Sequence, residues 1–341
     1  MTLPTRPLGT SGMDITAVGF GAWAIGGGGW AFGWGPQDDA DSLATMRRAL
    51  ELGINWIDTA AVYGLGHSEA VVGRLLGELQ PGERPLVFTK CGLVWDERNP
   101  MTEARRVLKP ESIRKEAEAS LRRLGVERID LYQFHWPDGG DVAVEDSWEE
   151  MDRLIEQGKV RAGGVSNFDV GLLRRCEKIR HVDSLQSPFS LIDRRAGAEL
   201  APWCAENGTG LICYSPMQAG LLTDTFSAER LALMDSRDWR RWHIEFSHFA
   251  PPALDTNLAL RDRLRPIAAR HDSTVAAVAV AWVLSWPGVT GAIVGSRSPD
   301  QVDGWIGAAR LSLTDDDLDE IEAALTELGA GTGPTRPPKA S

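Results

Sequence analysis

Short apolar runs recur along the chain, and each is followed by a longer segment whose apolar residues have the spacing of a helix. Runs such as Leu86–Lys90 and Gly291–Val294 contain consecutive apolar residues, which would face both sides of a sheet. This pattern is typical of strands in a parallel sheet that is covered by helices. We predict strands at Ala17–Gly21, Asn55–Thr59, Leu86–Lys90, Asp130–Phe134, Arg161–Val165, Ser184–Ser187, Gly210–Tyr214 and Gly291–Val294.

The segments between these runs predict the helices. Pro110 and Glu111 place a proline and an acid in the first turn of one helix, and Thr314 precedes a run of aspartates at the start of the last. This alternation predicts an α/β fold, a single (β/α)8 TIM barrel over residues 1–328, with a flexible tail at residues 329–341. The predicted helices are Ala40–Leu52, Ser68–Leu79, Pro110–Leu124, Ser147–Gln157, Val170–Ile179, Ala196–Glu206, Asn257–Ser285 and Pro299–Ile306.

A barrel of this kind takes roughly 250 residues, and the 341 residues of this chain exceed that length. The surplus lies in three long loops, Ala24–Asp39, Cys91–Lys109 and Met217–Thr256. All three follow predicted strands, so we expect them on the face where such barrels carry their active sites.

Net charge and cysteine content limit the kinds of partner, location and metal site that we expect. The chain has 36 Lys and Arg against 48 Asp and Glu, and this net charge of −12 has the wrong sign for neutralising phosphates. We therefore expect no nucleic-acid and no membrane partner. The 4 cysteines form no CxxC pair and no Cys/His spacing that suits zinc, so we predict a cytoplasmic, reducing location and no metal. The first residues also lack the order of a signal peptide.

One uncharged stretch, Ser273–Ser296, is long enough to span a bilayer. Pro287 and Gly288 interrupt it. We interpret it as a buried helix, Val275–Trp286, followed by the last strand of the barrel.

Ionisable residues stand at the ends of neighbouring predicted strands. Asp58 ends the second strand, Lys90 ends the third, and His135 follows the fourth. Tyr63 follows Asp58 in a Gly-flanked loop. Because the carboxyl ends of parallel strands meet at one end of a barrel, we expect these four side chains to converge.

The four groups suggest proton donation to a carbonyl. A tyrosine has a pKa near 10, and we expect the ammonium of Lys90 to lower it. Asp58 would keep the buried Lys90 charged, and a neutral His135 would orient a carbonyl oxygen. A proton donor without a nucleophile or a metal suits carbonyl reduction by an external hydride.

These residues lie in longer sequence motifs, and further motifs occur elsewhere in the chain. The segments are Gly53–Gly64, Ser68-Glu69, Thr89-Lys90, Asp130–Trp136 and Lys159–Phe168. Together they resemble the aldo-keto reductase superfamily, and within it the bacterial branch related to potassium-channel β subunits and stress-response reductases. The resemblance covers about residues 5–328. It implies NAD(P)H-dependent reduction of aldehydes or ketones in a (β/α)8 barrel, with Tyr63 as the general acid.

The resemblance also implies a cofactor site. Ser166, Asn167 and Gln186 correspond to side chains that hold the nicotinamide carboxamide, and Tyr214 to the ring stacked on the nicotinamide. Asp58 and a strand end would also contact the cofactor, and the segment after Tyr214 would wrap the pyrophosphate. These further expected contacts are Gly21, Ala22, Trp23, Ser215, Pro216, Met217, Gly220 and Leu221.

The adenine end should meet the turn after the last strand, where we expect Gly295, Ser296, Arg297 and Gln301 as contacts. Arg297 could hold a 2′-phosphate with its forked guanidinium, which favours NADPH over NADH. Many members of the family have a lysine where Gly295 stands and an asparagine where Trp305 stands.

Aromatic residues crowd the predicted active face. The chain has 13 tryptophans, and Trp23, Trp30, Trp34, Trp95 and Trp136 fall in or beside its loops. Flat apolar walls favour aromatic rings or sugar faces. We expect the substrate to meet Trp23, Tyr63, Trp95, His135 and Trp136.

The segment Trp239–His243 lies in the longest loop. Either it folds over the cofactor or it mediates subunit contacts. Its arginine pair, Arg240 and Arg241, could bind an acidic substrate group, although a solvated loop with an aromatic anchor is the simpler interpretation.

Two other functions stay open. The aromatic loops also suit a sugar or alcohol dehydrogenase working in the oxidative direction. The resemblance to channel subunits allows a regulatory subunit whose bound nucleotide reports redox state. A homo-oligomer is one of the assembly states that the sequence leaves open, and the expected small-molecule partner is a carbonyl compound or a sugar.

Overall fold

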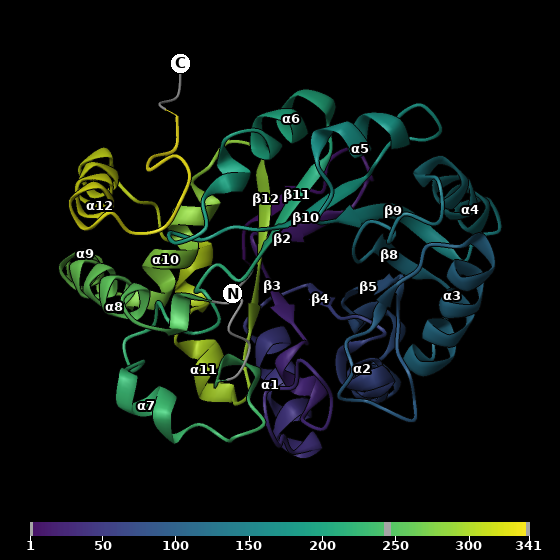
Figure 1. The fold of residues 1–341 in the computed structure, drawn as a ribbon, viewed down its shortest axis with the longest axis horizontal. Coiled ribbons are helices and arrows are strands. Elements are labelled where there is room, and N and C mark those ends of the chain that lie inside the picture. The colour runs from purple at the N-terminus through teal and green to yellow at the C-terminus, as the bar shows by residue number, and fades with distance from the viewer. Residues whose placement is uncertain (1–2, 242–246, 339–341) are drawn as a thin grey trace.

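Eight parallel strands form a closed barrel in the computed structural model, which describes residues 3–241 and 247–338 (Figure 1). The strands follow one another around the barrel in chain order, and the last pairs with the first. Each predicted strand overlaps an observed one, so the predicted (β/α)8 barrel is confirmed. The strands are β3 (Val18–Gly21), β4 (Trp56–Asp58), β5 (Leu86–Cys91), β8 (Ile129–Phe134), β9 (Val160–Ser166), β10 (Ser184–Pro188), β11 (Gly210–Tyr214) and β12 (Val289–Gly295).

Helices surround these strands, and α8, α9 and α12 form an additional layer at the left of Figure 1. The apolar faces of the surrounding helices and the outward faces of the strands form one continuous core. The helices are α1 (Asp39–Glu51), α2 (His67–Glu78), α3 (Pro110–Leu124), α4 (Val144–Glu156), α5 (Val170–Cys176), α6 (Leu200–Asn207), α7 (Ala228–Leu233), α8 (Ala253–Arg263), α9 (Arg265–Arg270), α10 (Val275–Leu284), α11 (Pro299–Asp303) and α12 (Asp315–Leu328).

The predicted helix Asn257–Ser285 is wrong as a single element, because the chain forms α8, α9 and α10 there. Pro266 lies in the first turn of α9, where its missing N–H is tolerated. Asp272 then adopts a φ of 46°, and the hydroxyl of Thr274 caps α10 by accepting the Ala277 N–H at 3.0 Å. Apolar spacing alone did not reveal these two breaks.

In the described part of the chain, no single helix is long and apolar enough to cross a membrane. The segments Ala253–Arg270 and Val275–Leu284 meet the length and composition test only as a pair bent by 91°. Every residue of α10 is buried, as expected for the uncharged stretch.

Two short hairpins were not predicted, because strands of two or three residues are too short to show an alternating pattern. The first pairs β1 (Thr5–Pro7) with β2 (Asp14–Thr16) and closes the base of the barrel. Its Leu8 and Ile15 pack against Trp56 inside the barrel, and the Trp56 indole donates a 2.9 Å hydrogen bond to the Thr16 carbonyl. The second pairs β6 (Leu93–Val94) with β7 (Arg105–Arg106) inside one predicted long loop.

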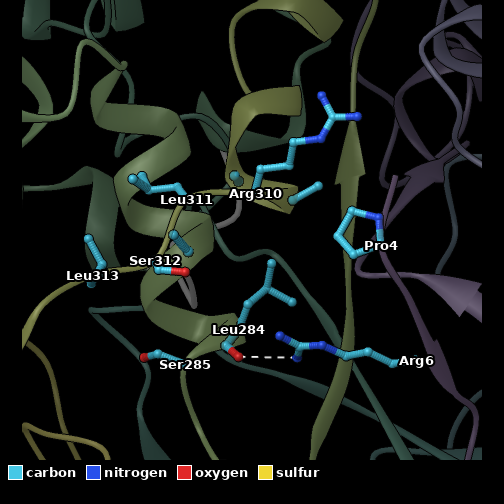
Figure 2. Close-up of a pocket in the computed structure, with 11 residues that line it drawn as sticks. Pro4, Arg6, Leu284, Ser285, Arg310, Leu311, Ser312 and Leu313 are labelled. Carbon is cyan, nitrogen blue, oxygen red and sulfur yellow. Dashed lines mark hydrogen bonds between the residues drawn. The ribbon is translucent and has the colours of Figure 1, made fainter. Parts of the chain in front are cut away.

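Arg6 ties the first hairpin to the outer helices. Its guanidinium donates to the carbonyls of Leu284, at the end of α10, and of Val289, at 3.2 and 2.9 Å. Figure 2 shows this side chain at the edge of a cavity of about 570 Å³ that Arg310 also lines. A cation at a helix C-terminus offsets the negative end of the helix dipole, so the arginine stabilises this junction.

The expected flexible tail makes defined contacts as far as it is described. Arg194 donates hydrogen bonds to the carbonyls of Ala330 and Gly333, and Thr332 forms a bridge with Asp193. Ala330 is buried. Since these contacts use backbone carbonyls, the Gly- and Pro-rich composition did not indicate them.

Trp56 supports the base of the barrel and has no exposed surface. We predict that Trp56→Ala lowers the free energy of unfolding by about 3–5 kcal/mol, because it removes a buried indole and leaves a cavity. Urea unfolding followed by circular dichroism measures the change. Leu233→Ala is the control, since Leu233 is 86% exposed and its loss should change stability by less than about 0.5 kcal/mol. Equal effects of both substitutions would contradict this role for Trp56.

Candidate active site

A buried ion pair lies at the carboxyl ends of β4 and β5. The ammonium nitrogen of Lys90 is 2.5 Å from Asp58 Oδ1, and the two residues are 1% and 2% exposed. The ammonium also donates to the Thr59 carbonyl at 2.8 Å and to the Tyr63 hydroxyl at 3.3 Å. These three contacts use all three N–H groups of the lysine and fix the direction of each.

Two glutamines complete the environment of Asp58. Gln186 donates to Asp58 Oδ2 at 2.9 Å, and Gln133 donates to the same oxygen at 3.3 Å. The Gln186 amide also donates to Gln133 Oε1 at 3.1 Å. No sequence pattern singled out Gln133, although it lies two residues after the inward-facing Leu131 of β8 and therefore on the same face of that strand.

The loop that carries Tyr63 is shaped by close backbone contact. A side chain at Gly64 would lie 2.1 Å from the Gly26 carbonyl oxygen, and Gly64 has a φ of 61°. Only glycine fits these two requirements, and Tyr63–Gly66 forms a tight turn in which Leu65 also has a positive φ of 56°. The Tyr63 ring then lies 5.6 Å from the His135 ring at an angle of 80°. The structure thus brings together all four residues that the sequence singled out for catalysis.

The direction of the Tyr63 pKa differs from our expectation. Burial raises the pKa of Tyr63 well above 10, and the carboxylate of Asp58 raises it further. We expected the ammonium of Lys90 to lower it, but the Asp58 carboxylate, 2.5 Å from that ammonium, offsets its effect on the phenol. Tyr63 is therefore a protonated donor near neutral pH.

The other two groups follow the expected pattern. Burial lowers the pKa of Lys90, and Asp58 opposes that effect. Burial, and then the charge of Lys90, hold the pKa of His135 well below its usual range. His135 is therefore neutral near pH 7, and a neutral imidazole can donate one hydrogen bond without carrying charge.

A cavity of about 1270 Å³ opens above this cluster. Tyr63 and His135 line it, whereas Lys90 is buried behind Tyr63. One end is surrounded by indole rings, and all the tryptophans expected on this face belong to the lining: Trp23, Trp30, Trp34, Trp95 and Trp136.

The longest loop crosses the cavity and contacts the loop after β3. Trp239 stacks on Trp23 with ring centroids 5.3 Å apart, and its backbone N–H donates to the Gly33 carbonyl at 3.0 Å. Trp34 forms a β-bridge with Asp238. Trp239 is thus the aromatic anchor of this segment, and Trp242 and His243 lie outside the described residues.

The residues expected to hold the nicotinamide lie together on the opposite wall. Tyr214 donates to Asn167 Oδ1 at 2.9 Å, and the Asn167 amide donates to the His135 carbonyl and to Ser166 Oγ, both at 3.0 Å. These side chains and Gln186 line the cavity. They offer amide and hydroxyl groups, which is the chemistry that a carboxamide needs.

The segment after Tyr214 has the backbone of an anion-binding loop. Ser215, Gln218 and Ala219 have φ values of 54°, 47° and 50°. Within the described chain, the N–H groups of Met217, Ala219 and Gly220 have no hydrogen-bond partner. Successive free amides in such turns form cradles for phosphate oxygens, so this loop fits a pyrophosphate.

Two of the expected cofactor contacts do not line the cavity. Ala22 donates its N–H to the Asp58 carbonyl at 2.8 Å, and Leu221 is buried in the core. The remaining expected cofactor contacts belong to the lining: Gly21, Trp23, Asp58, Ser166, Asn167, Gln186, Tyr214, Ser215, Pro216, Met217, Gly220, Gly295, Ser296, Arg297 and Gln301.

Arg297 stands at the far end of the cavity. Its Nε donates to Gln37 Oε1 at 2.8 Å, and its Nη2 donates to the Pro36 carbonyl. Beneath it, the Trp305 indole donates to Ser296 Oγ at 2.8 Å. The guanidinium is thereby held at the cavity rim by the loop that precedes α1.

A further, partly buried carboxyl lies next to the end of β5. Glu116 accepts the Gly92 N–H and the Ser112 hydroxyl, both at 2.9 Å. Burial raises the pKa of Glu116 to about 7, and the Gly92 N–H opposes the shift. This carboxyl therefore titrates near neutral pH and fixes the backbone two residues after Lys90.

Comparison with known proteins places these features in a family. The sequence profile of the Aldo/keto reductase family matches residues 17–326. An NADH-specific methylglyoxal reductase of Escherichia coli K12 is 33% identical to this chain, with 91% of this chain and 95% of that protein covered. Aldo-keto reductase yakc of Schizosaccharomyces pombe, labelled NADP(+), is 29% identical over 95% and 92% of the two chains.

A solved structure agrees with the sequence matches. The glycerol dehydrogenase AKR11B4 from Gluconobacter oxydans superimposes with a TM-score of 0.84 and is 35% identical. The match covers 99% of this chain and 98% of that one.

Glu116 predicts a pH-dependent stability. Its pKa is raised from 4.5 to about 7 in the fold, so its contribution is present below pH 4.5 and is lost as the pH rises through about 7. We expect Glu116→Gln to gain up to about 3 kcal/mol relative to the unsubstituted chain between pH 5 and pH 8. Urea unfolding of both proteins at the two pH values measures this gain. A stability difference that is the same at both pH values would contradict a neutral Glu116.

Proposed function

The chain belongs to the aldo/keto reductase family, and from that premise we propose that it reduces a small aldehyde or ketone with NADPH, using Tyr63 as the proton donor. Members of this family are oxidoreductases that act on carbonyl compounds with a nicotinamide cofactor. The observation that carries the proposal is the Lys90 ammonium, which contacts Asp58 Oδ1 and the Tyr63 hydroxyl at 2.5 and 3.3 Å.

The residues around the cavity fit such a cofactor. Asn167, Gln186 and Ser166 would hold the carboxamide, Tyr214 would contact the ring, and the free amides after Ser215 would bind the pyrophosphate. A reduced nicotinamide supplies a hydride when it is bound.

The side chains of this chain handle the proton. The Tyr63 hydroxyl and neutral His135 bind the carbonyl oxygen of the substrate and orient it. As negative charge develops on that oxygen, Tyr63 transfers its proton to it. Lys90 stabilises the resulting phenolate, because the ammonium already lies at hydrogen-bond distance from the phenol oxygen. Asp58 keeps that ammonium charged in a site without water contact.

The pKa of Tyr63 favours the reductive direction. A pKa well above 10 keeps the phenol protonated near neutral pH, as a proton donor requires. The oxidation of an alcohol would need the phenolate as a base and would be favoured only at alkaline pH. The glycerol dehydrogenase AKR11B4 is named for that direction, so this activity is the second candidate.

Arg297 supports NADPH as the preferred cofactor. Its guanidinium is held at the cavity rim by Gln37, near the N-terminus of α11. A forked cation in this position suits the 2′-phosphate that distinguishes NADPH from NADH. One relative is named for NADH and another for NADP(+), so the preference depends on this chain's own residues.

Tyr63→Phe tests the proton donor. We expect kcat for reduction to fall by about 100-fold or more, because the general acid is lost. NADPH affinity, measured by quenching of tryptophan fluorescence, should change by less than about 3-fold, because we expect the Tyr63 hydroxyl to act in the transition state and not in cofactor binding. Tyr132→Phe is the matched control, because Tyr132 belongs to the core outside the barrel. An equal loss of NADPH binding and turnover would contradict the assigned role.

Arg297→Gln tests the cofactor preference. We expect the Kd for NADPH to rise by about 10-fold and the Kd for NADH to stay within about 2-fold, because a charge-assisted contact to the 2′-phosphate is removed. Fluorescence titration with both nucleotides provides the comparison. If both affinities fall equally, Arg297 only supports the loop at Gln37.

A further inference from the structure

The arginines that line the cavity differ in how they are paired. Arg240 and Arg195 form ion pairs with aspartates, at 2.6 and 2.7 Å. Arg230 donates to Thr225, and Arg297 donates to Gln37. In the described ranges, Arg106 lines the same cavity without a hydrogen bond or an ion pair to its guanidinium.

Arg106 is held in place by an aromatic ring. Its guanidinium carbon lies 4.4 Å from the centre of the Trp136 ring, a cation–π contact. The stacked position leaves the N–H groups at the edge of the guanidinium available for hydrogen bonds in its plane. Trp136 directly follows His135, so Arg106 belongs to the substrate end of the cavity.

The hairpin explains why this residue and not its neighbour reaches the cavity. Arg105 and Arg106 form β7, and successive side chains of a strand point to opposite faces. Arg106 pairs with Leu93, which also lines the cavity, whereas Arg105 does not line it. The two arginines are therefore a matched pair with the same charge and different positions.

We propose that Arg106 binds an anionic group of the substrate, so that this reductase favours carbonyl compounds that carry a carboxylate or a phosphate at the end remote from the carbonyl. The inference rests on the proposed reduction at Tyr63. The guanidinium offers a planar fork that matches two oxygens of either anion. Arg106 is solvent-exposed at the cavity rim, so an incoming anion can reach its guanidinium.

The described acidic residues near Arg106 do not form an ion pair with it. Glu103 also lines the cavity, and no ion pair joins it to Arg106 among the described residues. The carboxylate of Asp138 is occupied by backbone N–H groups, including Leu108 at 2.7 Å and Asp141 at 2.8 Å. Within the described chain, neither carboxylate forms an ion pair with the guanidinium of Arg106.

Matched substrates test the inference with the full-length chain and saturating NADPH. The carboxylate arm compares para-carboxybenzaldehyde with its methyl ester. The phosphate arm compares para-formylphenyl phosphate with para-methoxybenzaldehyde. We expect kcat/KM for at least one anion to exceed that of its neutral partner by about 10-fold, mainly through a lower KM, as one charged hydrogen-bonding contact supplies. The arm with the larger ratio identifies the anion.

Arg106→Gln should remove about 10-fold in kcat/KM for that anion and change its neutral partner by less than about 2-fold. Arg105→Gln is the control and should leave both substrates within about 2-fold. Arg106→Lys should restore part of the preference, because it keeps the charge and loses the fork.

The outcomes separate the two claims. Equal kcat/KM values within each pair, or an equal effect of Arg106→Gln on both members, overturns the inference and leaves the proposed function standing. An enzyme that reduces none of the four aldehydes with NADPH or NADH overturns the proposed function, and the inference falls with it.

Discussion

A charged lysine deep inside a barrel requires a partner, and Lys90 has one in Asp58. The two groups are almost completely buried and 2.5 Å apart. Removing two charges from water costs several kcal/mol per ion, which is offset only when geometry and further hydrogen bonds are good. Here the second oxygen of Asp58 accepts from Gln133 and Gln186, and the lysine makes three contacts. The pair therefore fixes the direction of the ammonium toward Tyr63, on which the proposed chemistry depends.

The barrel provides this arrangement through strand order. β4, β5 and β8 are neighbours, and Lys90 pairs in register with Gln133. Asp58, Lys90 and Gln133, at the ends of these three strands, consequently lie at the same level of the barrel. The hairpin around Leu8 closes the opposite end, and the stack of Trp23 on Trp239 joins two loops across the mouth. The proposed catalytic residues and the buried cluster around Trp56 thus lie toward opposite ends of the same strands.

The sequence was sufficient for the barrel and for the four central residues, because apolar runs and strand ends obey simple geometry. It failed where the outcome depends on contacts between distant segments. The pKa of Tyr63 rises because the phenol is buried and lies near the Asp58 carboxylate, and both causes depend on distances in the fold, not on spacing in the sequence. The helix breaks near Pro266 and Thr274 were missed because the apolar spacing continues across both positions. The stacking of Arg106 on Trp136 joins two loops, and no period in the sequence reveals it.

The protonation state of Lys90 tests the central claim most directly. Carbon NMR of chain labelled at the lysine ε-carbon, titrated from pH 6 to pH 11, reports whether this amine is charged. We expect a charged Lys90 near pH 7 in the unsubstituted chain and a neutral Lys90 at the same pH after Asp58→Asn, because burial then acts without opposition. A Lys90 that is neutral in both proteins, or charged in both, would contradict the conclusion that Asp58 keeps the buried Lys90 charged.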